Sequence, residues 1–160
     1  MRRILLGACA LMTVCAAVAS VSGQAPDPFV GTWRTNIAHS QYDPVTMKPT
    51  NPSTLIRAVA GDGYRVTSKG VNGQGVPTSI EYTFSLDGKD YPLKGTTSAD
   101  SVAVIRIDAN THVQLRKKAG TVVSMYRQVV STDGQTLTSA EVGYKAGGEA
   151  SRNVLVFDRQ

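Results

Sequence analysis

The sequence predicts an all-β protein, a single antiparallel up-and-down barrel of about 8–10 strands. Short segments of alternating apolar and polar residues follow one another from residue 55 onward, separated by turns rich in Gly at the spacing typical of sandwiches and barrels. No segment has a sustained helical period or βαβ spacing. The only Trp of the chain, Trp33, follows Gly31 in the first strand-like segment, where a bulky ring can close one end of a small core.

The N-terminal segment has the organisation of a signal peptide. Arg2 and Arg3 precede a nearly unbroken apolar run over 4–21, and residues 23–25 fit the small-x-small cleavage rule. We therefore expect cleavage after Ala25, a signal peptide over 1–25 and a barrel domain over 26–160 that is exported to the periplasm or outside the cell. Lipidation at Cys9 is the competing interpretation. It is disfavoured because the apolar run before that residue is far shorter than the usual 7–15 residues.

Removal of 1–25 has two consequences. It leaves 135 residues, enough for one domain with a real core, and it removes both cysteines, Cys9 and Cys15. The expected mature chain therefore has no disulfide and no thiolate site. Its net charge is +3, because two arginines of the +5 total leave with the signal peptide. The basic cluster 116–118 adjoins a Gly turn and predicts a solvated hairpin end rather than a nucleic-acid surface.

The first half of the barrel is expected to begin with a strand around Gly31-Thr32-Trp33. Three prolines in 37–53 predict an irregular loop, with one helical turn near 38–42, that acts either as a lid or as a strap across the barrel end. Turns at 61–63 and at Asp87-Gly88 then separate strands. Pro92 predicts a bent or edge strand because it lacks a backbone donor. The expected strands are 29–35, 55–60, 64–69, 78–86 and 90–94.

The second half follows the same pattern of strand and tight turn. A Val- and Ile-rich segment begins at residue 101, turns occur at 108–111 and 119–120, and Asp133-Gly134 is a further hairpin signal. Connections of this kind favour a meander whose closure removes exposed edges. The expected strands are 101–107, 112–118, 121–130, 135–144 and 152–158.

These features resemble the calycin superfamily, which includes lipocalins and intracellular fatty-acid-binding proteins. The resemblance rests on Gly31-x-Trp33, the long segment after it, and a meander that ends in Val156-Phe157-Asp158-Arg159. The chain is most similar to small secreted bacterial lipocalin-like proteins. The resemblance implies that Trp33 packs at the closed end of the barrel and that an arginine covers its ring. Arg159 matches that position, with Arg152 as the lesser candidate, so Gly31, Trp33 and Arg159 are expected to be structural.

The chain departs from the fatty-acid-binding proteins in two places. Those proteins commonly carry Arg-x-Tyr in the last strand to hold a carboxylate, and this chain has Leu155-Val156-Phe157 there. They also carry a helix-turn-helix lid, which the prolines of 37–53 do not favour. The strand count is closer to the fatty-acid-binding proteins than to the eight-stranded lipocalins, so the subtype stays open.

Polar residues in phase with apolar strand positions are the candidate ligand contacts. Arg106 shares the phase of Val102 and Val104, and Arg127 shares the phase of Met125 and its neighbours. If these phases point inward, each arginine needs a partner, either an anionic ligand group or an acid such as Glu81 or Glu141. If they do not, the arginines lie at a mouth or on the outside. Tyr82 and Met125 are ligand candidates with core packing as the alternative, and Tyr126 is expected on the exterior.

The sequence offers little for catalysis or metal binding. His39, beside Ser40 and near Asp43, lies in one short loop and does not make a triad, and His112 follows a turn and is expected to be exposed. We therefore expect no enzyme activity, no cofactor, no metal and no nucleic-acid partner. The expected function is that of an exported carrier for a small, mostly hydrophobic molecule, with or without an anionic head. The alternative is a filled barrel that acts as a protein-interaction module or inhibitor.

Overall fold

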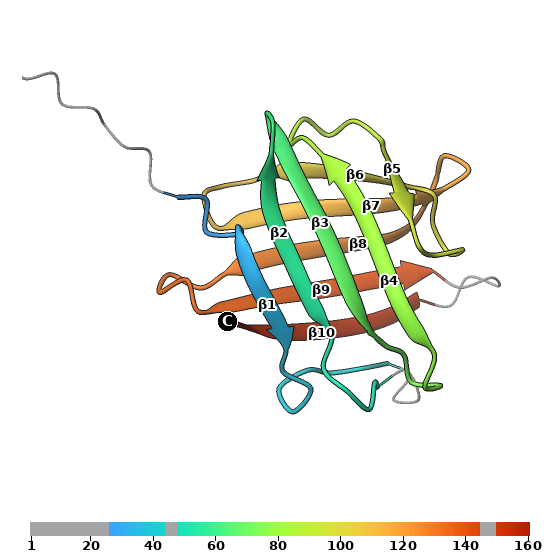
Figure 1. Ribbon diagram of the computed structural model, residues 1–160. Coiled ribbons are helices and arrows are strands. Elements are labelled where there is room, and N and C mark those ends of the chain that lie inside the picture. The colour runs from blue at the N-terminus through green and yellow to red at the C-terminus, as the bar shows by residue number, and fades with distance from the viewer. Residues whose placement is uncertain (1–25, 44–47, 145–149) are drawn as a thin grey trace, which may run out of the picture.

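A computed structural model describes residues 26–43, 48–144 and 150–160, and these residues form one closed antiparallel barrel of ten strands (Figure 1). Each strand pairs with the next along the chain, and β10 pairs with β1 to close the barrel. The expected all-β up-and-down barrel is therefore confirmed, with ten strands. They are β1 (Gly31–Thr35), β2 (Thr54–Ala60), β3 (Gly63–Val71), β4 (Pro77–Phe84), β5 (Tyr91–Lys94), β6 (Ser101–Arg106), β7 (Thr111–Lys118), β8 (Thr121–Val130), β9 (Thr136–Tyr144) and β10 (Ala150–Arg159).

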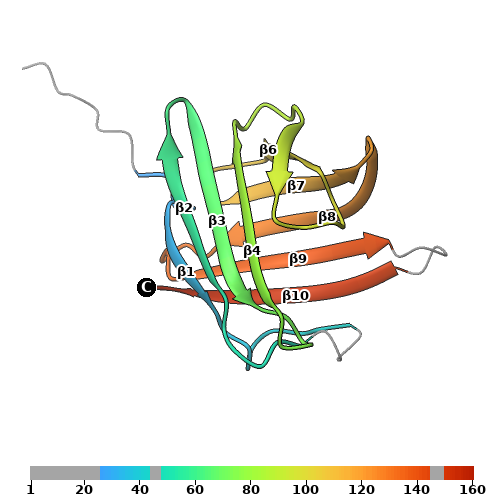
Figure 2. The same cartoon turned by 45° about the vertical axis from the view of Figure 1, so that its right-hand side comes forward.

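The strands form two layers that cross each other. In Figure 1, β1 to β4 run steeply across the front and β6 to β10 run across them behind. Figure 2 shows the same two layers after a turn of 45° about the vertical axis. We call residues 26–30 the leader. The barrel end that carries the leader and the turn at 107–110 is the leader end, and the end that carries 36–53 and the turn at 119–120 is the loop end.

The two walls of the interior differ in polarity. The inner face of β1 to β5 buries mainly apolar and aromatic side chains, namely Trp33, Leu55, Val66, Tyr82, Phe84 and Leu93, with Thr35 and Arg57 as its buried polar residues. The inner face of β7 to β10 buries polar side chains, namely His112, Gln114, Ser124, Gln128, Ser139 and Asn153. Val130, Leu137 and Phe157 complete the apolar core near the leader end. The barrel therefore encloses one apolar wall and one largely polar wall.

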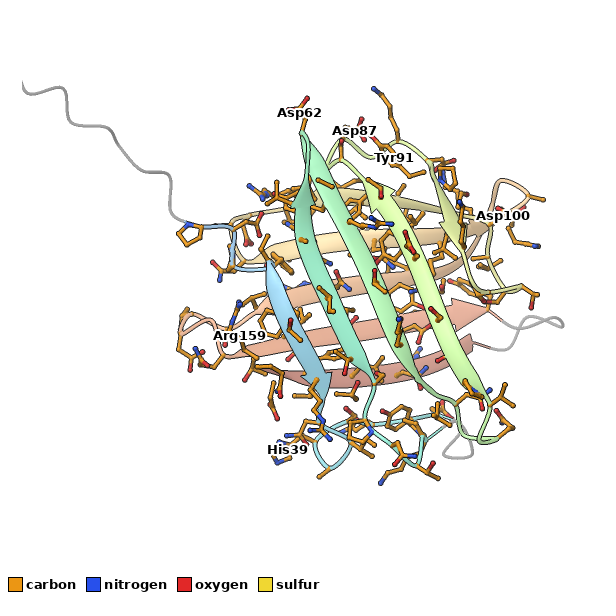
Figure 3. All side chains as sticks on the ribbon, in the orientation of Figure 1. His39, Asp62, Asp87, Tyr91, Asp100 and Arg159 are labelled. Atoms are coloured by element: carbon orange, nitrogen blue, oxygen red, sulfur yellow. The ribbon has the colours of Figure 1, made fainter. Side chains whose placement is uncertain are left out.

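Trp33 and Arg159 join the first and last strands at the leader end. The two residues are direct cross-strand partners, and the Arg159 guanidinium carbon lies 4.2 Å from the centroid of the fully buried Trp33 ring. Arg159 Nη1 donates to the Val30 carbonyl at 2.9 Å. Gly31 has φ +149°, and a Cβ there would collide with Arg159 Nη1. Glycine at position 31 therefore lets Arg159 reach over the ring. Figure 3 shows where Arg159 lies.

The described part of 37–53 is a strap rather than a lid. Gln41 pairs with Val154 of β10 through two backbone hydrogen bonds, of 2.7 and 2.9 Å, and the Asp43 amide donates to Asn153 Oδ1 at 2.9 Å. The segment thus continues along β10 where β1 ends. The helical turn expected near 38–42 is wrong, because 37–39 form a simple turn before this pairing begins. Residues 44–47 lie outside the described part of the chain.

The first strand begins later than expected. β1 starts at Gly31, and Phe29 belongs to a turn in which the Val30 amide donates to the Asp27 carbonyl at 3.0 Å. The turn directs the Phe29 ring into the barrel, where it is fully buried. The expected signal peptide, with Cys9 inside it, lies outside the described residues. Within the described ranges, no segment forms the kind of long apolar helix that spans a bilayer.

Candidate ligand-binding site

Arg57 is the centre of the buried polar interior. It lies on β2 in phase with Leu55, and it is 1% exposed. Its Nη2 donates to Gln128 Oε1 at 2.9 Å, and its guanidinium carbon lies 4.9 Å from the Phe29 ring centroid. No carboxylate of the described residues lies within 4 Å of it. Burial lowers the pKa of Arg57 and the more distant Asp27 carboxylate acts against this shift, but arginine remains protonated in proteins, so the interior holds a positive charge that forms no ion pair with these residues.

His112 lies beside Arg57 on the opposite wall. Its side chain is fully buried and stacks on Phe29, with ring centroids 3.8 Å apart and an interplanar angle of 10°. Burial and the neighbouring Arg57 charge lower the pKa of His112 to about 4, so the ring is neutral at pH 7. The expectation of an exposed His112 is wrong, because the strand turns it inward and the leader covers it.

Two buried N–H groups of this cluster lack an acceptor. Arg57 Nη1 lies 3.3 Å from His112 Nδ1, and arginine can only donate, so Nδ1 accepts and the ring proton is assigned to Nε2. Within the described residues, neither His112 Nε2 nor Arg57 Nε has a hydrogen-bond partner. A positive charge and two free donors together favour an anionic oxygen as a ligand atom.

Tyr82 is one of the predicted ligand contacts that the structure places inside. It is 4% exposed on β4, and its hydroxyl donates to Gln114 Oε1 on β7 at 2.9 Å. This bond connects the apolar wall to the polar wall across the interior. Gln114 is the next inward-facing residue after His112 on β7. Tyr82, which contacts Gln114, therefore lies one inward-facing position away from the Arg57 and His112 cluster.

Arg106 points inward but lies at the leader-end mouth, with its side chain 39% exposed. It forms an ion pair with the Asp27 carboxylate and donates to the Tyr64 hydroxyl at 3.3 Å. Burial opposes ionisation of Asp27, but hydrogen bonds from Tyr64 and the Phe29 amide, with the Arg106 charge, lower its pKa. A pocket of about 640 Å³ opens beside this pair, lined by Pro26, Asp27, Pro28, Tyr64, Arg106, Ala109 and Asn110. The partner of Arg106 is therefore an acid of the leader rather than Glu81 or Glu141.

Arg127 and Met125 lie on the outer face of β8. Met125 is 43% exposed and Arg127 is also exposed, while Ser124, Tyr126 and Gln128 point inward and are buried. Of the two alternatives for Arg127, the outer face therefore holds, and Met125 is neither an inward ligand contact nor part of the core. Tyr126, expected on the exterior, points inward instead. β8 therefore turns its more apolar face outward and its more polar face toward the barrel interior.

The cluster that sequence reasoning missed is Arg57 with His112. For Arg57 a signal was present in the strand period. Arg57 lies two residues after Leu55 and so shares its face, just as Arg106 lies two residues after Val104. For His112 the signal is its pairing with Arg106 across the 107–110 turn, which puts both on one face. Within the described residues no three His, Cys, Asp or Glu side chains gather in a way that could hold a metal ion.

Comparison with protein-family models gives no match for this chain, and comparison with curated proteins gives none. Among solved structures, the chain is similar to zebrafish ileal bile acid-binding protein complexed with cholic acid. The TM-score is 0.58 at 14% sequence identity, and the match covers 83% of this chain and 99% of the zebrafish chain. This likeness is one of fold, and it confirms the expected resemblance at that level: the chain has the closed antiparallel barrel of a bile acid-binding protein.

Proposed function

We propose that this protein is an exported, non-catalytic binding protein for a small, mostly hydrophobic molecule that carries an anionic group. The observation that carries the proposal is the buried charge of Arg57, which has no carboxylate partner among the described residues. Removing an unpaired charge from water costs several kcal/mol. An anionic group of a ligand, bonded by Arg57 and His112, would offset that cost.

The two walls of the barrel suit an amphipathic ligand. The apolar wall that carries Val66, Phe84 and Leu93 would pack against the hydrophobic body, and the polar wall would accept its remaining hydrophilic groups. The zebrafish protein of similar fold was solved with cholic acid, which supports this class of ligand by analogy of fold.

One observation favours the filled barrel as a second candidate. The Phe29 ring stacks directly on His112 and lies over Arg57, so the leader already occupies space beside the proposed anion site. A ligand that reaches Arg57 must therefore share that space with Phe29 or displace it. If Phe29 is never displaced, the barrel is a filled scaffold and acts through its surface as an interaction module.

Titration calorimetry on residues 26–160 separates the two candidates. The probes are cholate and laurate, with methyl cholate as the neutral counterpart of cholate. We expect at least one of the two anions to bind, and methyl cholate to bind at least about tenfold more weakly than cholate, a difference of about 1.4 kcal/mol. If no probe binds, and native mass spectrometry of protein from an exporting host shows no mass that is lost on denaturation, the filled barrel replaces the carrier.

Export is tested on the same preparation. N-terminal sequencing of protein recovered from the periplasm or medium is expected to begin at Pro26. Recovery of only the uncleaved chain in the cytoplasm would contradict export, without bearing on ligand binding.

A further inference from the structure

A second, smaller pocket lies at the loop end, on the polar wall. It has a volume of about 300 Å³ and is lined chiefly by inward-facing residues of β7 to β10, among them Arg116, Ser124, Tyr126, Glu141 and Ser151. Arg116 lies opposite Ser124, and Gly143 lies opposite both Ser124 and Ser151. Because residue 143 has no side chain, the space between these strands stays open. A Cβ there would lie 2.8 Å from Ser151 Oγ.

Tyr126 lies at the centre of this pocket and contacts two charged groups. Its hydroxyl donates to Glu141 Oε1 at 2.6 Å, and the Arg116 guanidinium carbon lies 4.7 Å from the centroid of its ring. Burial raises the pKa of Tyr126, so the phenol keeps its proton and remains a donor to Glu141. The positive group therefore lies over the ring and the negative group lies at its hydroxyl end.

Neither charge is neutralised within the part of the chain that the structure describes. Glu141 accepts one hydrogen bond on each oxygen, from Tyr126 and from Asn153 Nδ2 at 2.9 Å, and both donors are uncharged. Arg116 and Glu141 form no ion pair with each other or with another described residue. The Arg116 Nε atom is buried and has no described partner. The pocket thus presents separate, unpaired positive and negative groups.

We infer that this pocket binds a small zwitterion that carries both a carboxylate and an ammonium group, of the class of free α-amino acids. The carboxylate would bind Arg116, and the ammonium would bind Glu141. The Ser124 and Ser151 hydroxyls, which donate weakly to the Tyr126 hydroxyl at 3.4 Å and to the Gly143 carbonyl at 3.5 Å, would rotate to donate to the carboxylate. A simple anion would leave Glu141 unpaired and be repelled by it, and a simple cation would meet the same penalty at Arg116. Only a ligand with both charges neutralises both groups.

This site is distinct from the proposed anion site. Arg57 and His112 lie toward the leader end, whereas Arg116 and Glu141 lie toward the loop end. Along β7, Arg116 is two inward-facing positions beyond His112. Along β9, Glu141 is one inward-facing position beyond Ser139. The two proposals can therefore fail separately. Loss of cholate binding says nothing about the zwitterion, and absence of amino-acid binding says nothing about cholate.

Calorimetry with residues 26–160 tests the inference. The zwitterionic probes are glycine, leucine and phenylalanine, and two analogues of leucine each lack one charge: 4-methylpentanoate has no ammonium and 3-methylbutylamine has no carboxylate. We expect at least one amino acid to bind, and for leucine each analogue to bind at least about tenfold more weakly. The inference is overturned if no amino acid binds with a Kd below about 10 mM, or if either analogue binds as well as leucine.

Matched variants locate the binding. Glu141→Gln keeps the shape and an acceptor, and Arg116→Gln keeps a donor, so both are expected to fold and to weaken the bound amino acid by tenfold or more. Arg127→Gln, on the outer face of β8, is expected to leave that affinity unchanged. Circular dichroism confirms folding. Unchanged affinity in folded Glu141→Gln and Arg116→Gln would overturn the assignment of this pocket.

Discussion

The arginines of the interior differ in what neutralises or solvates them. Arg159 donates to backbone carbonyls and covers Trp33, and Arg106 pairs with Asp27. Arg57 is the most buried of the three and has only neutral partners, Gln128 and His112, among the described residues. A cation that is buried so completely without an ion pair among these residues is the residue-level feature on which the proposed function depends.

The burial of His112 predicts a pH dependence of stability. Its pKa is about 4 in the folded chain and near 6.5 when unfolded, so between these values the unfolded state binds a proton that the folded state does not. The free energy of unfolding therefore falls as pH falls through this window. The variant His112→Asn removes the titrating ring, and its Oδ1 can still accept a hydrogen bond from Arg57. When the pH is lowered from 7.5 to 4.5, the free energy of unfolding measured in urea should fall by about 2–3 kcal/mol more for the wild type than for His112→Asn.

The control for this experiment is His39→Asn, because His39 is exposed in the strap, as Figure 3 shows. That variant should keep the full pH dependence of the wild type. An equal pH dependence in the wild type and His112→Asn would show that His112 is not the buried neutral ring described above.

Gly31 and Arg159 should be coupled energetically. Gly31→Ala introduces a Cβ against the Arg159 guanidinium at a φ that L-residues rarely adopt, so we expect a loss of about 1–3 kcal/mol of unfolding free energy. In an Arg159→Ala background only the backbone strain remains. A double-mutant cycle by urea unfolding should therefore give an interaction energy of about 0.5–3 kcal/mol, and additive losses would contradict the close approach.

At the scale of the element, the strands were predictable and the inward faces were not. Turn residues such as Asp87-Gly88 and Asp133-Gly134 and the two-residue period mark each strand to within a few residues. The period separates two faces of a strand without saying which one is buried. On β8 the apolar face, with Met125, is exposed and the face with Gln128 is buried, so the usual assumption that apolar residues face inward selects the wrong side.

The leader is a second element whose role the sequence did not reveal. Phe29 was expected to begin the first strand, but a turn directs its ring into the barrel, where it stacks on His112 and lies beside Arg57. Contacts between residues so distant in sequence leave no local pattern, and for the same reason the Arg57 and His112 cluster was not predicted. The pairing of Trp33 with Arg159 came from the family resemblance, since nothing local links the two.

Phe29→Ala should therefore destabilise the barrel strongly. The ring is fully buried, and its loss should cost about 3–5 kcal/mol in urea unfolding followed by Trp33 fluorescence. The matched control is Ile56→Ala on the outer face of β2, where the side chain is 45% exposed and the loss should be within about 0.5 kcal/mol. If the two variants were equally stable, the leader would not be part of the core.

At the scale of the whole molecule, the ten-stranded closure follows from local order along the chain, and this part of the fold was the most predictable. Each strand pairs with its neighbour in sequence, and the pairing of β1 with β10 removes the remaining edges. What local order does not determine is the division of the interior into an apolar wall and a polar wall. That division is the basis of the proposal that the ligand is amphipathic.

The most direct test compares two arginine variants of residues 26–160 in calorimetric titration with cholate, or with laurate if cholate is the weaker probe. Arg57→Met and Arg127→Met remove the same charge, the first from the interior and the second from the outer face. We expect Arg57→Met to weaken binding at least about tenfold and Arg127→Met to bind as the wild type does. Wild-type affinity in a folded Arg57→Met variant, or an equal loss in both variants, would contradict the proposed binding role of Arg57.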